Sequence, residues 1–171
     1  VDISIHEHDR IILVGENGCG KSSLLKALKR TDGIDDGTIW LSPNLKLFYL
    51  EQNPPIPSIN NLLDFFTEDI EFPDMSKIND IIEQLNLKNI NYRKRLSGGE
   101  IRKIYIAKSI LSEPDIFLLD EPTNHLDLPA IDWLERKLIL LKKTMVIVSH
   151  DQEFLKKIGT KTFWLHKGKV L

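Results

Sequence analysis

The sequence predicts an α/β fold built on a mostly parallel sheet. Short apolar runs at 11–14, 116–119 and 145–148 are typical of buried strands, and they alternate with stretches of helical spacing. Every residue within these runs is apolar, with no polar residue at alternate positions. Both faces of the sheet are therefore expected to be covered by helices.

Three prolines between 53 and 57 interrupt this alternation, and two helical stretches follow them. Residues 53–96 are therefore predicted to form an α-helical subdomain inserted into the α/β core. The short segments 38–41 and 45–50 are expected to be strands near an edge of the sheet. The sheet as a whole is expected to be mostly parallel with a small antiparallel edge. The full list of expected elements is: strand 11–14, helix 21–30, strands 38–41 and 45–50, helices 59–68, 76–86 and 98–112, strand 116–119, helix 130–141, strand 145–148, helix 152–158 and strand 162–165.

Length and composition limit the function. A chain of 171 residues, 42% of them apolar, is expected to form a single domain over 1–171. The formal net charge of −2 argues against a sequence-specific DNA-binding protein. Cys19 is the only cysteine, which favours a reducing, cytoplasmic location. No apolar run is long enough for direct membrane insertion.

A phosphate-binding string lies between the first expected strand and helix. It runs Gly15-Glu16-Asn17-Gly18-Cys19-Gly20-Lys21-Ser22 and has the form G-x-x-x-x-G-K-S, typical of a P-loop NTPase core. Backbone N–H groups of such a loop surround phosphate oxygens, the lysine reaches the β and γ phosphates, and the serine hydroxyl binds Mg²⁺. The alternative is a glycine turn before an ordinary helix. The string predicts ATP and Mg²⁺ as cofactors, with these binding residues: Gly15, Glu16, Asn17, Gly18, Cys19, Gly20, Lys21, Ser22 and Ser23.

Polar residues follow three of the expected strands. Asp120 and Glu121 end an apolar run, where one carboxylate is suited to holding Mg²⁺ and the next to orienting or deprotonating water. His150 follows another buried strand, and Gln52 supplies a neutral amide that could sense the γ-phosphate. Ligands of open α/β sheets bind at the carboxyl ends of strands, so these side chains are expected to meet there. A solvated strand end and a structural histidine are the alternatives.

The string Leu96-Ser97-Gly98-Gly99-Glu100 allows two interpretations. Ser97 and Glu100 have the spacing of a capping box, which begins a helix without any ligand. Two glycines in a first helical turn are unfavourable for a helix, however, and they indicate that something approaches the backbone closely. Because the start of a helix binds anions, Ser97, Gly98 and Gly99 are candidate phosphate ligands.

Taken in order along the chain, these motifs resemble the ATP-binding cassette (ABC) superfamily, and the similarity covers nearly the whole sequence. The resemblance implies that 15–22 is the Walker A loop, that 116–120 is the Walker B strand and that Ser97, Gly98 and Gly99 belong to the signature loop. It further implies catalytic roles for Glu121, His150 and Gln52, metal ligation by Ser22, Gln52 and Asp120, and a D-loop at Asp127.

The resemblance also implies partners. In the superfamily two cassettes pack head to tail and enclose ATP between the Walker motifs of one and the signature loop of the other. A second cassette, in the same parent chain or in a homodimer, is therefore expected. The runs 120–127 and 149–155 are similar to the ABC-F group of soluble proteins with two fused cassettes, many of which act on the ribosome during translation. The ATPase subunit of a membrane transporter and a non-hydrolysing interaction module remain alternatives.

Overall fold

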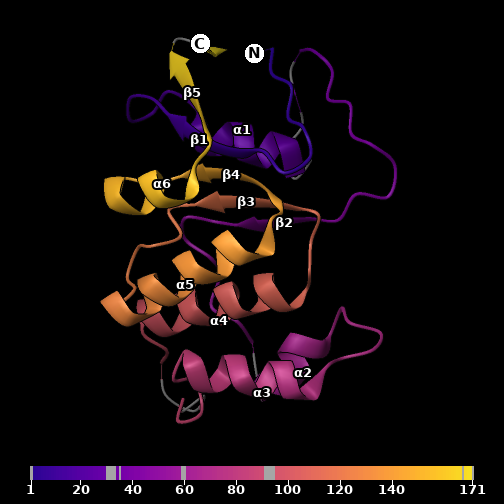
Figure 1. Ribbon diagram of the computed structural model, residues 1–171, viewed down its shortest axis with the longest axis vertical. Helices are drawn as coiled ribbons and strands as arrows, with labels where there is room; N and C mark the ends of the chain where they lie inside the picture. Colours follow the sequence, from indigo (N-terminus) through magenta and orange to yellow (C-terminus); the bar gives the residue numbers. More distant parts are fainter. Residues whose placement is uncertain are drawn as a thin grey trace.

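A six-stranded sheet with the strand order β2-β3-β4-β1-β5-β6 forms the centre of the molecule (Figure 1). The computed structural model describes residues 2–29, 34, 36–58, 61–90, 95–166 and 168–170. The elements are β1 (Arg10–Val14), α1 (Lys21–Lys29), β2 (Leu47–Leu50), α2 (Leu62–Thr67), α3 (Met75–Gln84), α4 (Gly98–Leu111), β3 (Ile116–Asp120), α5 (Leu128–Leu141), β4 (Thr144–Val148), α6 (Gln152–Ile158), β5 (Lys161–His166) and β6 (Lys169–Val170).

The strands from β2 to β5 are parallel, and β6 pairs antiparallel with β5 at the edge. Successive residues of the central strands point to opposite faces of the sheet, as the strand period of two requires. In β3, Phe117 and Leu119 join one apolar cluster while Leu118 joins the other. Since all three are nearly inaccessible to solvent, the sheet is covered on both faces.

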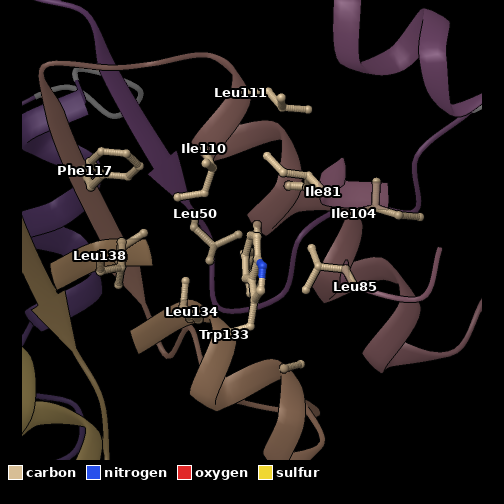
Figure 2. Close-up of a cluster of buried hydrophobic side chains, with 14 of the residues drawn as sticks. Leu50, Ile81, Leu85, Ile104, Ile110, Leu111, Phe117, Trp133, Leu134 and Leu138 are labelled. Atoms are coloured by element: carbon tan, nitrogen blue, oxygen red, sulfur yellow. The ribbon is translucent and has the colours of Figure 1, made fainter. Parts of the chain in front are cut away.

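Helix α1 covers one face of the sheet, and α4, α5 and α6 cover the other (Figure 1). The larger apolar cluster lies on this second face, and Trp133 of α5 is at its centre, among side chains of α3, α4, β2 and β3 (Figure 2). Helices α2 and α3 lie farther from the sheet and pack against α4. The phosphate-binding string therefore lies on the α1 side of the core, and the signature string begins α4 on the other side.

The predicted fold class is confirmed: the protein has an α/β fold with a mostly parallel sheet and a small antiparallel edge. The antiparallel edge is formed by β5 and β6. The strand expected over 45–50 lies at the opposite edge of the sheet, as β2. Segment 38–41 forms no strand, and Trp40 within it is 81% exposed. A strand needs a neighbour to pair its backbone, and no described strand pairs with this segment.

Other predicted elements occur with shifted ends. The helix expected over 59–68 begins at Leu62, where the side chain of Asn61 accepts the N–H of Leu63, and residues 59 and 60 are outside the described part of the chain. Helix α1 ends at Lys29, and Arg30 is likewise outside the described residues. None of the helices in the described ranges is long and apolar enough to cross a lipid bilayer.

Candidate functional site

The phosphate loop, residues 15–22, joins β1 to α1, as the sequence predicted. Glycine is required at its first position, because a Cβ on Gly15 would lie 2.4 Å from the carbonyl oxygen of Leu165. Gly18 and Gly20 have φ angles of 78° and 100°, in a region that side chains disfavour. The loop can therefore turn its backbone N–H groups towards one point, which is the arrangement that binds a phosphate.

The ammonium group of Lys21 is held over this loop. Its Nζ donates to the carbonyl oxygens of Gly15 at 2.8 Å and of Glu16 at 2.9 Å. A positive charge thus lies beside the start of α1, where the helix dipole adds further positive potential. Both features favour a polyanionic ligand such as a triphosphate.

The predicted site residues meet in one cavity of about 390 Å³ at the carboxyl ends of the strands. It is lined by Asn17, Gly18, Gly20, Lys21, Ser22, Ser23, Gln52, Asp120, Glu121, Val148 and His150. Among the predicted ligands, Gly15, Glu16 and Cys19 shape the loop without lining this cavity, and Cys19 packs against the apolar cluster on the α1 side of the sheet. Four segments that are far apart in sequence therefore provide one polar pocket.

Asp120 lies at the end of β3 and is 1% exposed. Its Oδ2 accepts a hydrogen bond from the hydroxyl of Tyr49 at 3.4 Å. Its Oδ1 is buried and has no hydrogen-bond partner among the described residues. A buried carboxylate oxygen without a partner is costly, so it indicates a ligand that the pocket is built to receive.

The donor set fits Mg²⁺. The carboxylate of Asp120, the hydroxyl of Ser22 and the amide of Gln52 all line the cavity, and each provides the oxygen that Mg²⁺ prefers. No group of three or more His, Cys, Asp or Glu side chains gathers as a metal site within the described ranges. A cation with few protein ligands, completed by water and phosphate oxygens, matches this arrangement.

Glu121 follows Asp120 and is only 3% exposed. Its backbone φ is 50°, and its N–H donates to the carbonyl oxygen of Val148 at 2.8 Å. A glutamate in this left-handed conformation is uncommon, and such strain gathers at functional sites. The bond to β4 holds the peptide there, which turns the side chain towards the end of the neighbouring strand.

His150 meets this carboxylate. The backbone N–H of His150 donates to Oε2 of Glu121 at 3.1 Å, and its Nε2 lies 3.4 Å from Oε1. The Glu121 side chain is 4% exposed, whereas the imidazole is 73% exposed. The pair therefore combines a buried, oriented carboxylate with an imidazole that faces the open side of the pocket.

The signature loop, residues 96–100, does not line this cavity. Ser97 caps α4: its Oγ accepts the N–H of Glu100 at 3.2 Å, and the Glu100 carboxylate accepts the N–H of Ser97 at 2.7 Å. The capping-box interpretation of this string is therefore correct. Ser97 and Gly98 are exposed, so the start of the helix is open to a second molecule.

Among the described residues, the atoms that lie near the two glycines of the signature loop belong to His125 of the same chain. A Cβ on Gly99 would lie 2.7 Å from the carbonyl oxygen of His125, and one on Gly98 would meet the ring of His125 at 3.5 Å. His125 itself has a φ of 64°. Lys103 donates to the carboxylate of Asp127 at 2.7 Å. The segment 121–127 between β3 and α5, called the D-loop below, therefore contacts α4 at a second point.

Three residues at or near the site were not identified from the sequence: Tyr49, His125 and Arg102. Arg102 had a detectable signal, because it lies four residues before the buried Ile106 on the apolar side of α4. A charged residue at such a position indicates a specific buried partner. Tyr49 and His125 had no comparable signal, since their contacts depend on the packing of β2 and of the D-loop.

Comparison with known proteins agrees with this geometry. A protein-family model described as "ABC transporter" matches residues 1–124. The chain belongs to the ABC ATPase family. The cassette is most like members of the ABC-F group, and its family implies that it binds ATP.

Curated relatives named "ATP-binding protein Uup" match almost the whole cassette. The protein of Buchnera aphidicola subsp. Schizaphis graminum is 36% identical over 97% of this chain, that of Caulobacter vibrioides 39% over 99%, and that of Escherichia coli K12 33% over 99%. The cassette spans about a third of the length of these relatives, 29%, 28% and 33% respectively.

Solved structures share the fold. An ATP-binding subunit of an ABC transporter superimposes with a TM-score of 0.84 at 19% identity, covering 98% of this chain and 79% of that chain. The RNase-L inhibitor superimposes with a TM-score of 0.80 at 26% identity, covering 96% of this chain and 34% of that chain. The first likeness concerns the fold alone, because its sequence identity is low.

Proposed function

We propose that this cassette binds Mg²⁺-ATP in the cavity between the phosphate loop and Glu121, and that it hydrolyses the ATP when a second cassette closes the site. The observation that carries the proposal is the buried carboxylate of Glu121, held by the N–H of His150 beside a phosphate-binding loop. A general base must lie within reach of the water that it deprotonates, and this position meets that requirement.

Binding follows from groups of this chain. The N–H groups of the loop and the ammonium of Lys21 hold the β and γ phosphates, and Lys21 exchanges its present carbonyl partners for phosphate oxygens. Asp120, Ser22 and Gln52 would hold Mg²⁺, which when bound offsets charge on the phosphates.

Hydrolysis requires an oriented water. Glu121 accepts a proton from this water as the water oxygen forms a bond to the γ-phosphorus. The bond from that phosphorus to the β–γ bridging oxygen breaks, and its electron pair leaves with ADP. The imidazole of His150 lies beside the carboxylate, and in this proposal it contacts the γ-phosphate from the open side.

A second cassette completes the site in this proposal. The exposed start of α4, with Ser97, Gly98 and Gly99, offers N–H groups and a hydroxyl to an anion, yet it lies outside the chain's own cavity. An equivalent loop of another cassette is therefore the group that would close over the γ-phosphate. We also propose that residues 1–171 form a single ATPase domain with a helical subdomain at 53–96.

The proposed cellular action is on the ribosome during translation, in the cytoplasm. It is supported by the likeness to ABC-F proteins and to a solved complex of the archaeal ribosomal stalk protein aP1 and the archaeal ribosome recycling factor aABCE1, with a TM-score of 0.80 and 25% identity. A second candidate, the ATPase of a membrane transporter, is supported by the match to the family model described as "ABC transporter". Ribosome co-sedimentation in the presence of ATP supports the first, and co-purification with a membrane permease supports the second.

The test of hydrolysis is the substitution Glu121→Gln. The amide keeps an oxygen for the N–H of His150 but cannot accept the proton, so we expect kcat to fall about 100-fold or more while ATP affinity changes little. Glu83→Gln is the matched control, because Glu83 is exposed and pairs only with Lys88 among the described residues. Equal rates of hydrolysis by the Glu121→Gln variant and the unsubstituted chain would show that Glu121 is not the general base.

A further inference from the structure

Arg102 of α4 is a buried cation that the proposed hydrolysis does not use. It is 1% exposed, although arginine is seldom buried without partners. Its Nη1 donates to the carbonyl oxygen of Glu51 at 2.9 Å, and its Nη2 donates to the carbonyl oxygen of Gln52. Its Nε has no partner among the described residues. The guanidinium thus donates its hydrogen bonds to the carbonyl groups of two consecutive residues that follow β2.

The charge of Arg102 is compensated at longer range. Burial lowers the pKa of the Arg102 guanidinium, and the charges of Asp120 and Glu121 oppose this by stabilising its cationic form. These two carboxylates belong to the nucleotide site, so the charge of Arg102 is linked to the same pocket as its hydrogen bonds.

The same residue lies close to the signature loop. Arg102 is five positions after Ser97 on one continuous helix, which corresponds to about 7.5 Å along the axis. A helix of this length is stiff over one and a half turns, so a displacement of Arg102 is transmitted to the start of α4. The Arg102 side chain therefore connects two segments: the one after β2 that carries Gln52, and the signature loop at the start of α4.

We infer that Arg102 is a positioning residue that couples the two halves of the catalytic arrangement. When Gln52 moves to contact a bound nucleotide, its carbonyl oxygen and that of Glu51 draw the guanidinium with them, and the signature loop moves as well. The planar fork of arginine is suited to this, because it bonds two acceptors at fixed separation. This inference rests on the proposed ATP binding, and it adds the residue through which a movement of Gln52 reaches the signature loop.

The test uses Arg102→Lys, which keeps the charge but removes the two-pronged fork. Arg136→Lys is the matched control, since it makes the same chemical change at an exposed position of α5. For Arg102→Lys we expect the KM for ATP to stay within about threefold of the value for the unsubstituted chain. We expect kcat to fall about 100-fold, because a small misplacement of catalytic groups caused by a remote change has an effect of about this size. A residue with a purely structural role would lower the amount of folded protein without separating kcat from KM.

Amide hydrogen exchange provides a second readout without turnover. ATP is added to the Glu121→Gln chain at a concentration where sedimentation shows a monomer. We expect ATP to slow exchange at the amides of 98–102 in this chain and in its Arg136→Lys variant, and to leave them unchanged in the Arg102→Lys variant. Exchange at 98–102 in the chain that retains Arg102 still tests whether ATP affects the signature loop, even where Arg102→Lys fails to fold.

The outcomes separate the two proposals. If the parent chain binds no ATP, the proposed function is overturned, and the coupling with it. If ATP binds but exchange at 98–102 does not respond in the chain that retains Arg102, the coupling alone is overturned. The role of Arg102 is also overturned if Arg102→Lys matches Arg136→Lys in kcat and in exchange.

Discussion

The two glycines of the signature loop are expected to respond differently to the same small substitution. A Cβ on Gly99 would lie 2.7 Å from the carbonyl oxygen of His125, a backbone atom that cannot rotate away. A Cβ on Gly98 would meet the His125 ring at 3.5 Å, an ordinary van der Waals contact. Neither glycine has a positive φ, so alanine can adopt both backbone conformations.

The magnitude follows from two opposing effects. Alanine is favoured over glycine within a helix by up to about 1 kcal/mol, and this gain is similar at the two neighbouring positions. Overpacking at Gly99 costs about 1–3 kcal/mol, because the D-loop must shift to relieve the contact. Gly98→Ala is therefore expected to be neutral or slightly stabilising, and Gly99→Ala to be less stable than Gly98→Ala by about 1–3 kcal/mol.

Urea unfolding followed by circular dichroism measures this difference. Both variants and the parent chain are compared at one protein concentration, and equal m-values establish that the midpoints report stability. Comparing the two variants with each other cancels the helix propensity, so the remaining difference reports the contact with His125. Gly99→Ala with a stability equal to or above that of Gly98→Ala would refute the conclusion that the carbonyl oxygen of His125 packs closely against the backbone at Gly99.

Two further predictions concern stability. The hydrogen bond from the Lys103 side chain, and next the one from the N–H of Ala130, lower the pKa of Asp127 below its ordinary 3.8. The ionised Asp127 carboxylate therefore stabilises the fold above pH 3.8, and this stabilisation is lost as pH falls through the pKa of Asp127 in the folded state. Asp127→Asn keeps a capping oxygen but loses the charge, and its urea midpoint should therefore fall less than that of the parent chain between about pH 5 and about pH 3; an equal fall would contradict this. Leu134→Ala should cost about 2–5 kcal/mol because Leu134 is 2% exposed, whereas Leu140→Ala on the same helix, at a 75% exposed position, should stay within about 0.5 kcal/mol. Equal unfolding midpoints for these two variants would contradict the orientation of α5.

Much of the fold was predictable because its signals are local. The buried strands β3 and β4 were recognised as unbroken apolar runs, and α6 was predicted with its observed bounds, 152–158. The strand expected over 38–41 was wrong, because this segment resembles a strand in composition but pairs with no strand of the described sheet. Strand formation depends on a neighbour that local composition does not reveal.

In the candidate site, too, local motifs were predictable and contacts between distant segments were not. The phosphate loop, Asp120, Glu121 and His150 were identified from short strings, and the rule that ligands bind at the carboxyl ends of strands correctly predicted that they share one cavity. The glycines of the signature loop were expected to let an anion approach the backbone, whereas the close neighbour of Gly99 among the described residues is the carbonyl oxygen of His125. That this neighbour is His125 of the same chain was not predictable, because it depends on how the D-loop folds back onto α4.

The chemical groups available to this protein are visible in its residues alone: a glycine loop with a lysine, two adjacent carboxylates, a histidine and a helix start with glycines. These are properties of residue type and short spacing, which require no knowledge of distant contacts. Which groups meet depends on the folded chain: Arg102 donates to the carbonyl oxygens of Glu51 and Gln52, which are 51 and 50 residues away, and Glu121 accepts the N–H of His150, 29 residues away. The physical reason is that burial and hydrogen-bond geometry arise when sheet and helices pack together, so partners that are far apart in sequence are selected by the fold rather than by any local pattern.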